Sequence, residues 1–283
     1  MARSILITGC SSGIGLCAAQ TLQARGWRVF ATARQPEDIT RLKNEIGVES
    51  LYLDYAEPHS ISAAAEHVLS ATGGTLTALY NNGGYGQPGA LEDIRPDVLR
   101  AQFEVNVFGW HDLTRRVIPA MRARGEGRIV FCSSVLGLIA APYRGSYCAS
   151  KFAVEALADT LRMELQGSGI YVSLIEPGPI ATRFVERAIE AYRRNVDLEA
   201  SVHRDIYRVR IASMEAGGQT TYKLGPEAVA GKLVHALESP HPKFRYYVPS
   251  RLRRGAIAQT PASGRPRRRG QAELGRVLIN RDW

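Results

Sequence analysis

The feature that most constrains the fold is the regular alternation of short apolar runs with longer segments of helical period. The expected strands are residues 3–8, 27–33, 49–53, 76–81, 127–133, 170–176 and 244–248. The expected helices are residues 13–25, 36–46, 58–71, 96–124 (interrupted near Gly109 or Pro119), 146–167, 180–216 and 226–238. Strands separated by helices need crossover connections, which are almost always right-handed and give parallel sheets. The pattern predicts an α/β fold, a doubly wound, mostly parallel Rossmann-like sheet with helices on both faces.

Charge divides the chain into two parts. One domain accounts for residues 1–250, whereas residues 251–283 hold nine arginines against two acids and carry seven of the nine net positive charges. The body is therefore nearly balanced, and we expect a basic, poorly ordered tail. Binding of nucleic acid or an anionic surface through this tail is the less favoured alternative. The abrupt change in composition fits either a lineage-specific extension or a shifted reading frame.

Several classes of protein are not expected from this sequence. No uncharged apolar run approaches the roughly 20 residues that cross a bilayer, and the N-terminal apolar run is too short for a signal peptide. The four cysteines show no CxxC spacing, which favours reduced thiols and a cytoplasmic location. The six histidines form no HExxH or Cys/His cluster, so we expect no metal site.

A glycine-rich turn, with the sequence TGCSSGIG at residues 8–15, joins the first expected strand to the first expected helix. Glycines allow a tight turn and let a pyrophosphate approach the backbone, where the helix N-terminus offers free N–H groups. The order strand, turn, helix predicts dinucleotide binding. The residues assigned to the cofactor here are Gly9, Ser11, Ser12, Gly13, Ile14 and Gly15.

The end of the second expected strand indicates which cofactor is bound. In dinucleotide folds an acid at this point binds the ribose 2′-hydroxyl of NAD. This chain reads Ala-Thr-Ala-Arg at residues 31–34, and Arg34 is suited to bind a phosphate with two hydrogen bonds. The sequence therefore predicts NADP(H), with NAD(H) as the second choice and a solvent-facing Arg34 as the alternative interpretation.

Tyr147 and Lys151 are four residues apart at the start of an expected helix, so both project from one face. A lysine ammonium beside a phenol favours the phenolate, and we expect it to lower the pKa of Tyr147 below about 10. Such a tyrosine can act as a general acid or base. Taken alone, the YxxxK spacing also fits an ordinary helix surface.

The motifs in their order resemble the short-chain dehydrogenase/reductase family over about residues 3–248. They are TGxxxGxG at residues 8–15, Asp54 after the third strand, NNGG at residues 81–84, Asn106, Ser134 thirteen residues before Tyr147, the Tyr147/Lys151 pair, and PGPIAT at residues 177–182. Within the family, the sequence is similar to 17-beta-hydroxysteroid and retinol dehydrogenase-like members and also resembles bacterial NADP-dependent aldehyde reductases.

The resemblance implies a role for each matching residue. Tyr147 exchanges a proton with the carbonyl or alcohol oxygen, Ser134 binds that oxygen, and Lys151 tunes Tyr147 and binds the nicotinamide ribose. Asn106 holds a water in a proton relay. The remaining assignments are Asp54 to the adenine, Asn81 to the adenosine ribose, and Ile180 and Thr182 to the carboxamide. These residues also have structural interpretations, as a strand end for Ser134, a packed side chain for Asn106 and a turn cap for Asp54.

The resemblance also implies a function and an assembly. We expect an NADP(H)-dependent oxidoreductase that reversibly reduces an apolar aldehyde or ketone, acting as a homodimer or homotetramer. A steroid or retinoid dehydrogenase is the runner-up. An alternative of another class is a dinucleotide-binding sensor or interaction protein without chemistry, although such proteins typically lose the tyrosine or lysine that this chain keeps.

Overall fold

The structure is a computed structural model and describes residues 3–217 and 223–248. Its strands form one sheet in the order β3-β2-β1-β4-β5-β6-β7, and every neighbouring pair is parallel. The strands are β1 (Ser4–Ile7), β2 (Arg28–Ala33), β3 (Glu49–Tyr52), β4 (Ala78–Asn81), β5 (Gly127–Cys132), β6 (Ile170–Pro177) and β7 (Arg245–Val248). The predicted doubly wound α/β fold is confirmed, whereas the predicted tail at 251–283 lies outside the described residues.

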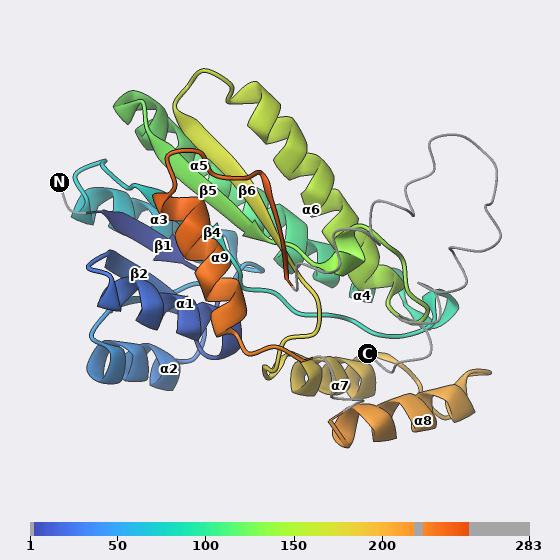
Figure 1. The fold of residues 1–283 in the computed structure, drawn as a ribbon. Coiled ribbons are helices and arrows are strands. Elements are labelled where there is room, and N and C mark those ends of the chain that lie inside the picture. Colours follow the sequence, from blue (N-terminus) through green and yellow to red (C-terminus); the bar gives the residue numbers. More distant parts are fainter. Residues whose placement is uncertain (1–2, 218–222, 249–283) are drawn as a thin grey trace.

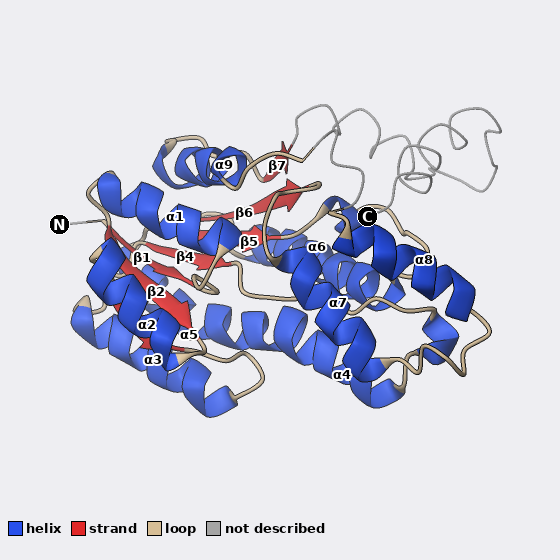
Figure 2. Ribbon diagram, turned by 90° about the horizontal axis from the view of Figure 1, so that it is seen from below, coloured by secondary structure: helices blue, strands red, loops and turns tan. Residues whose placement is uncertain are grey.

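Helices cover both faces of the sheet (Figures 1 and 2). Helices α1 and α9 pack together on one face, and α3 packs beside α5 on the other. The bounds are α1 (Gly13–Ala24), α2 (Pro36–Arg41), α3 (Pro58–Ala71), α4 (Pro96–Phe103), α5 (Gly109–Arg124), α6 (Gly145–Glu164), α7 (Phe184–Asn195), α8 (Arg204–Glu215) and α9 (Glu227–Glu238). The central strands are apolar because they are enclosed on both faces: every residue of β1 and β4 is buried.

The expected helix at 96–124 is interrupted just before Gly109, and the interruption is a local change in helix type. A π-helical turn, Glu104–Phe108, separates α4 from α5, and Pro119 lies inside α5 without ending it. Such turns shift the side chains of a helix locally and are frequent at functional sites. Here the turn carries Asn106, which is completely buried.

The expected helical stretch at 180–216 is two helices, α7 and α8, which lie side by side beyond the sheet (Figure 1). They enclose a second, smaller apolar cluster that includes Tyr192, Tyr207 and Met214. Because this cluster is separate from the main core, α7 and α8 form a cover over the carboxyl ends of the strands rather than part of the sheet's own packing.

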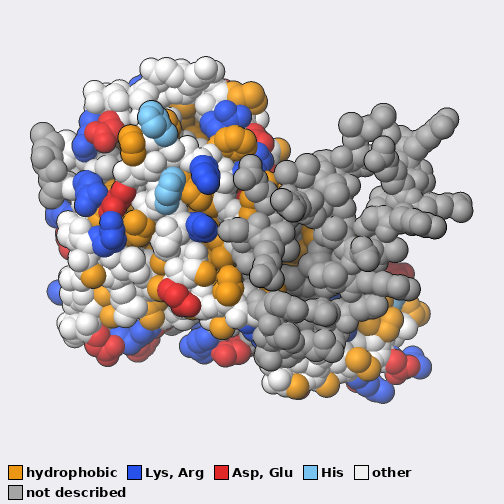
Figure 3. All heavy atoms as spheres, viewed as in Figure 1, with side chains coloured by type: hydrophobic (Ala, Val, Ile, Leu, Met, Phe, Trp, Pro, Cys, Tyr) orange, Lys and Arg blue, Asp and Glu red, His pale blue; other side chains and the backbone are white. Residues whose placement is uncertain are grey.

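Positive and negative side chains are interspersed on the face that carries α1 and α9 (Figure 3). Several arginines of the described chain are paired with acids, for example Arg25 with Glu238 and Arg28 with Glu49. This mixture matches the nearly balanced charge expected for the body of the chain.

Tyr55 links the residue that follows β1 to the last residue of β4, close to the glycine-rich turn. Its buried hydroxyl lies 2.9 Å from Thr8 Oγ1 and 2.8 Å from Asn81 Oδ1. We expect Tyr55→Phe to lower the free energy of unfolding by about 1–2 kcal/mol, because buried polar partners lose a hydrogen bond. Tyr52→Phe is the control, since the Tyr52 hydroxyl binds Glu57 at the surface. Urea unfolding of both variants checks this, and equal stability of the two contradicts it.

Candidate active site

In the glycine-rich turn, backbone atoms pack directly against other backbone atoms, which leaves no room for a side chain at Gly9 or Gly15. Gly9 has a φ of +70°, and a Cβ on Gly15 would lie 2.2 Å from the carbonyl oxygen of Gly9. The turn also touches the segment after β4, because a Cβ on Gly9 would lie 2.5 Å from Cα of Gly83. The main-chain amides of residues 11–14 donate to no residue that the structure describes. These free donors at the start of α1 fit a pyrophosphate.

Arg34 and Asp54 follow β2 and β3 at the same edge of the sheet. Their Nη1 and Oδ2 atoms lie 3.5 Å apart, and the Arg34 side chain is 59% exposed. Asp54 also caps its own turn, since its Oδ1 accepts a hydrogen bond from the Ala56 amide at 2.9 Å. The structure thus brings together the two residues that the sequence assigned to the adenosine half of a cofactor.

The loop after β6 reaches over the start of α1. A Cβ on Gly13, whose φ is +57°, would lie 2.9 Å from Cγ2 of Thr182, so only glycine allows this approach. Ile180 forms a bridge with Leu224, which holds the loop in place. Thr182 therefore stands beside the glycine-rich turn, and its contact with a nicotinamide carboxamide stays a prediction.

The two predicted asparagines are engaged in structural hydrogen bonds. The buried Asn81 side chain lies against the Tyr55 hydroxyl and donates to Thr114 Oγ1 at 2.9 Å. Any contact of Asn81 with a ribose must therefore come from its main chain. Asn106 Oδ1 accepts from the Tyr85 amide, and its Nδ2 donates to the Tyr85 carbonyl at 2.9 Å and to Ser150 Oγ at 3.2 Å. Its role in a water relay stays a prediction.

Ser134 and Tyr147 meet at the carboxyl end of β5. Ser134 caps the short helix that follows, accepting from the Leu136 amide at 3.1 Å, and its hydroxyl donates to the Pro177 carbonyl at 3.4 Å. Hydrogen bonding from Ser134 also acts on the Tyr147 hydroxyl and lowers the pKa of that tyrosine. Phe184 lies edge-on to the Tyr147 ring with centroids 5.5 Å apart.

Lys151 is buried one turn after Tyr147, with only 4% of its surface exposed. Its Nζ donates to the Cys132 carbonyl at 2.8 Å, lies 4.2 Å from the centroid of the Trp110 ring, and lies 5.7 Å from that of Tyr147. Burial lowers the pKa of Lys151 to about 8. The ammonium is thus held by a carbonyl and an aromatic face on the same side of α6 as Tyr147.

The predicted lowering of the Tyr147 pKa is wrong for this structure. Burial raises the pKa of Tyr147 above its ordinary value, and this effect exceeds the lowering by Ser134 and by the positive charge of Arg144. The sequence pattern showed the neighbouring lysine but not the loss of water around the phenol, which disfavours the phenolate. Tyr147 is consequently a neutral phenol at physiological pH and is suited to donate a proton.

Two further residues complete the site and were missed from the sequence. Trp110 supports Lys151 with its ring and donates from Nε1 to the Gly83 carbonyl at 2.7 Å. In the sequence, its position four residues after Asn106, one helical turn along, could have indicated that Trp110 belongs to the site. Arg144 is buried three residues before Tyr147, and its charge acts on that hydroxyl. In the sequence, a single basic residue in an otherwise uncharged stretch before Tyr147 could have indicated Arg144.

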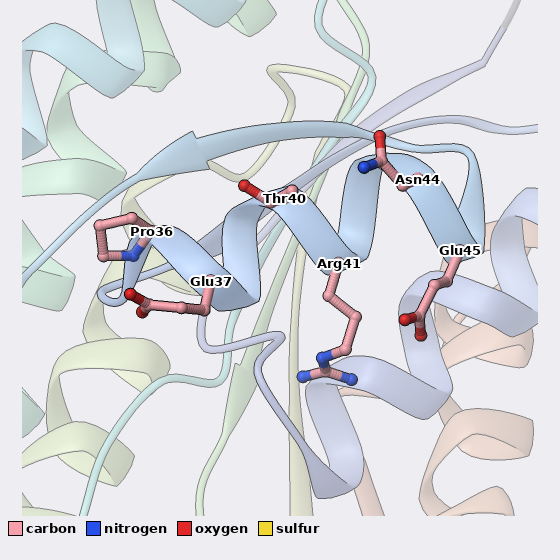
Figure 4. A pocket seen from close by; sticks show the side chains of 6 residues that line it. All are labelled: Pro36, Glu37, Thr40, Arg41, Asn44 and Glu45. Carbon is pink, nitrogen blue, oxygen red and sulfur yellow. The ribbon is translucent and has the colours of Figure 1, made fainter.

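A shallow pocket lies on α2 and the following turn, away from Tyr147, and is lined by Pro36, Glu37, Thr40, Arg41, Asn44 and Glu45 (Figure 4). Arg41 extends from α2 toward the neighbouring helix (Figure 4) and donates to the Ser11 carbonyl at 2.6 Å. This arginine braces the glycine-rich turn, and the mixed charges of the pocket suit a solvated helix surface.

Two features are absent from residues 3–217 and 223–248, the part of the chain that the structure describes. In this part of the chain, no cluster of three or more His, Cys, Asp or Glu side chains could hold a metal ion. None of its helices is both long enough and apolar enough to cross a bilayer.

Comparison with known proteins agrees with this geometry. The short chain dehydrogenase family model matches residues 3–193. The uncharacterized oxidoreductase YbbO of Escherichia coli K12 is 46% identical over 248 residues, covering 88% of this chain and 86% of that protein. Human 17-beta-hydroxysteroid dehydrogenase type 1 is 35% identical over 266 residues, covering 89% of this chain and 79% of that protein.

A solved structure shares the fold. It is a short chain dehydrogenase/reductase from Burkholderia phymatum in complex with NAD, with a TM-score of 0.76, 26% identity, and coverage of 94% of this chain and 97% of that one. The family match, the all-parallel sheet and the assembled Ser134, Tyr147 and Lys151 lead to the same conclusion. The chain belongs to the short-chain dehydrogenase/reductase family and is an NAD(P)-dependent oxidoreductase.

Proposed function

We propose that this protein reduces an apolar aldehyde or ketone to the alcohol with NADPH, with Tyr147 as the proton donor. The observation that carries the proposal is the buried Tyr147, held beside Ser134 and one helical turn from the Lys151 ammonium, where burial raises the pKa of the phenol. A neutral phenol can give a proton to a carbonyl oxygen, whereas a phenolate could only accept one.

Residues that could hold the cofactor lie on both sides of the glycine-rich turn. The free amides of residues 11–14 would bind the pyrophosphate, Thr182 the carboxamide, and Lys151 the nicotinamide ribose. When bound, the nicotinamide supplies the hydride that reaches the carbonyl carbon. Tyr147 would donate its proton to the carbonyl oxygen, and the Ser134 hydroxyl would turn from the Pro177 carbonyl to donate a hydrogen bond to the same atom. The Lys151 charge would stabilise the negative charge left on Tyr147.

Arg34 supports NADPH over NADH. Its exposed guanidinium stands after β2, where NAD enzymes place an acid, and its 3.5 Å pairing with Asp54 leaves it accessible to an added phosphate. The absence of an acid at residues 31–34 leaves no ribose-binding carboxylate directly after this strand.

The apolar substrate class rests on the side chains above Tyr147. Phe184 packs on the Tyr147 ring, and α7 and α8 carry the apolar cluster around Tyr192 and Met214. The similarity to human 17-beta-hydroxysteroid dehydrogenase type 1 supports a steroid or retinoid alcohol as the second candidate. A panel of aldehydes, ketones, steroids and retinoids, followed by cofactor absorbance with NADPH and NADH, distinguishes the two. No turnover of any of them would contradict the proposed substrate class.

Tyr147→Phe tests the proton donor. We expect turnover to fall about 10²–10⁴-fold, because the variant keeps the ring and loses only the hydroxyl that donates the proton. NADPH binding, followed by fluorescence, should stay close to wild type. Tyr171→Phe, on an exposed tyrosine of β6, is the control and should leave turnover unchanged. Wild-type turnover in Tyr147→Phe contradicts the assignment.

The pH dependence of reduction should follow Lys151. Its pKa of about 8 lies below the ordinary 10.5, so the ammonium predominates below pH 8 and is lost as the pH rises through 8. Tyr147 stays protonated over the same range because burial raises its pKa. We therefore expect kcat for reduction to fall with a midpoint near pH 8. A rate that stays flat between pH 7 and about 10 would argue against a role for this ammonium.

Arg34→Asp tests the cofactor preference. Replacing a cation by an acid at the end of β2 should weaken NADPH binding and favour NADH, shifting the ratio of kcat/KM values by about 10-fold or more, which corresponds to roughly 1.4 kcal/mol. Arg34→Gln, which removes the charge alone, should give an intermediate ratio. Unchanged ratios in both variants would exclude Arg34 as the selecting residue.

A further inference from the structure

A buried ion cluster lies one helical turn beyond Lys151. Glu155 on α6 has a side chain only 7% exposed, and its Oε2 lies 3.0 Å from Arg245 Nη2. The same Nη2 lies 2.7 Å from Oδ2 of Asp159, while Arg245 Nε lies 3.1 Å from Oε1 of the fully buried Glu176. One guanidinium from β7 therefore joins carboxylates from α6 and β6.

The reduction described above uses none of these groups, yet burying them is costly. Burial and the negative charge of Glu155 raise the pKa of Glu176 to about 9, so Glu176 keeps its proton at neutral pH. Burial also raises the pKa of Glu155 itself, and hydrogen bonding from Ser133 and the positive charge of Arg245 oppose this rise. Asp159, which is more exposed, already links α6 to β7 through the same Nη2. The link between α6 and β7 therefore does not by itself explain why the second carboxylate, that of Glu155, is buried.

The surroundings of Lys151 supply that reason. The titratable and charged groups packed around Lys151 and Glu155 are Tyr147 and Asp159 on α6, Cys132 on β5, Glu176 on β6 and Arg245 on β7. Two of them, Cys132 and Glu155, act on the pKa of Lys151 and raise it when negatively charged. Burial raises the pKa of Cys132, so its thiol is neutral at physiological pH. Arg245 Nη2, 3.0 Å from Glu155 Oε2, favours the carboxylate form of Glu155, and that carboxylate is the negative charge that opposes the loss of the Lys151 proton.

We infer that Glu155, held in place by Arg245, is a positioning residue that keeps the buried Lys151 charged beside Tyr147. The inference rests on the proposed reduction, in which the ammonium supports the proton donor. Three features carry it: the spacing of four residues between Lys151 and Glu155, the burial of both side chains, and the two-element anchor provided by Arg245.

The chain offers a matched pair of variants. Glu155→Gln and Asp159→Asn each remove one negative charge from α6, and each removes an ion pair with the same Arg245 Nη2. Only Glu155 is one turn from Lys151, since Asp159 is two turns away. A purely structural role of the cluster would affect both variants alike, whereas a role for Glu155 in holding the Lys151 charge would affect one.

The chain contains five lysines, which makes a direct titration practical. In protein labelled with [13Cε]lysine, the Lys151 resonance is identified by its loss in Lys151→Arg. We expect a midpoint near pH 8 in the wild type, a midpoint lower by about half a unit or more in Glu155→Gln, and no such shift in Asp159→Asn. The alkaline fall of kcat should move with the Lys151 midpoint.

An unchanged Lys151 midpoint in Glu155→Gln, or an equal shift in Asp159→Asn, overturns the inference. If Glu155→Gln does not fold, Glu155→Asp carries the test: it keeps the charge and must hold the midpoint within about 0.3 units of wild type, and a larger fall overturns the inference. The titration needs no turnover. A protein that reduces no carbonyl but shows these midpoints would refute the proposed reduction and leave the link between Glu155 and Lys151 intact.

Discussion

The burial of the Lys151 ammonium is the constraint on which the rest of the site depends. An ammonium in a protein interior loses its water, and it is tolerated only where other groups replace that water. Here the Cys132 carbonyl and the Trp110 ring do so, and each reaches Lys151 from a different element. Because Trp110 is itself bonded to the Gly83 carbonyl beside the glycine-rich turn, α6 and this turn are fixed to each other.

The parallel sheet explains why residues so far apart in sequence converge. All strands point the same way, so the segments that follow β1, β4, β5 and β6 meet at one edge, where open α/β sheets bind their ligands. The glycine-rich turn, Gly83, Ser134 and Thr182 each follow one of these strands. Tyr147 and Lys151 then come from α6, which packs against β6.

Sequence reasoning located most of the elements because each strand is a short apolar run bounded by turn residues or a helix start. It also placed Tyr147 and Lys151 on one helix face, which follows from local geometry alone. It could not show the π-helical turn at Glu104–Phe108 or the division of 180–216 into α7 and α8, since both depend on contacts with distant segments. The direction of the Tyr147 pKa was missed for the same reason: Phe184 packs on its ring from 37 residues away in sequence.

A crystal structure with NADPH and a slowly reduced apolar ketone tests the central claim most directly. The account predicts the pyrophosphate on the amides of residues 11–14 and the ketone oxygen within hydrogen-bond distance of both the Tyr147 hydroxyl and Ser134 Oγ. It also predicts that Lys151 Nζ contacts the nicotinamide ribose. A ketone oxygen bound away from Tyr147, or a cofactor bound elsewhere than the glycine-rich turn, would contradict it.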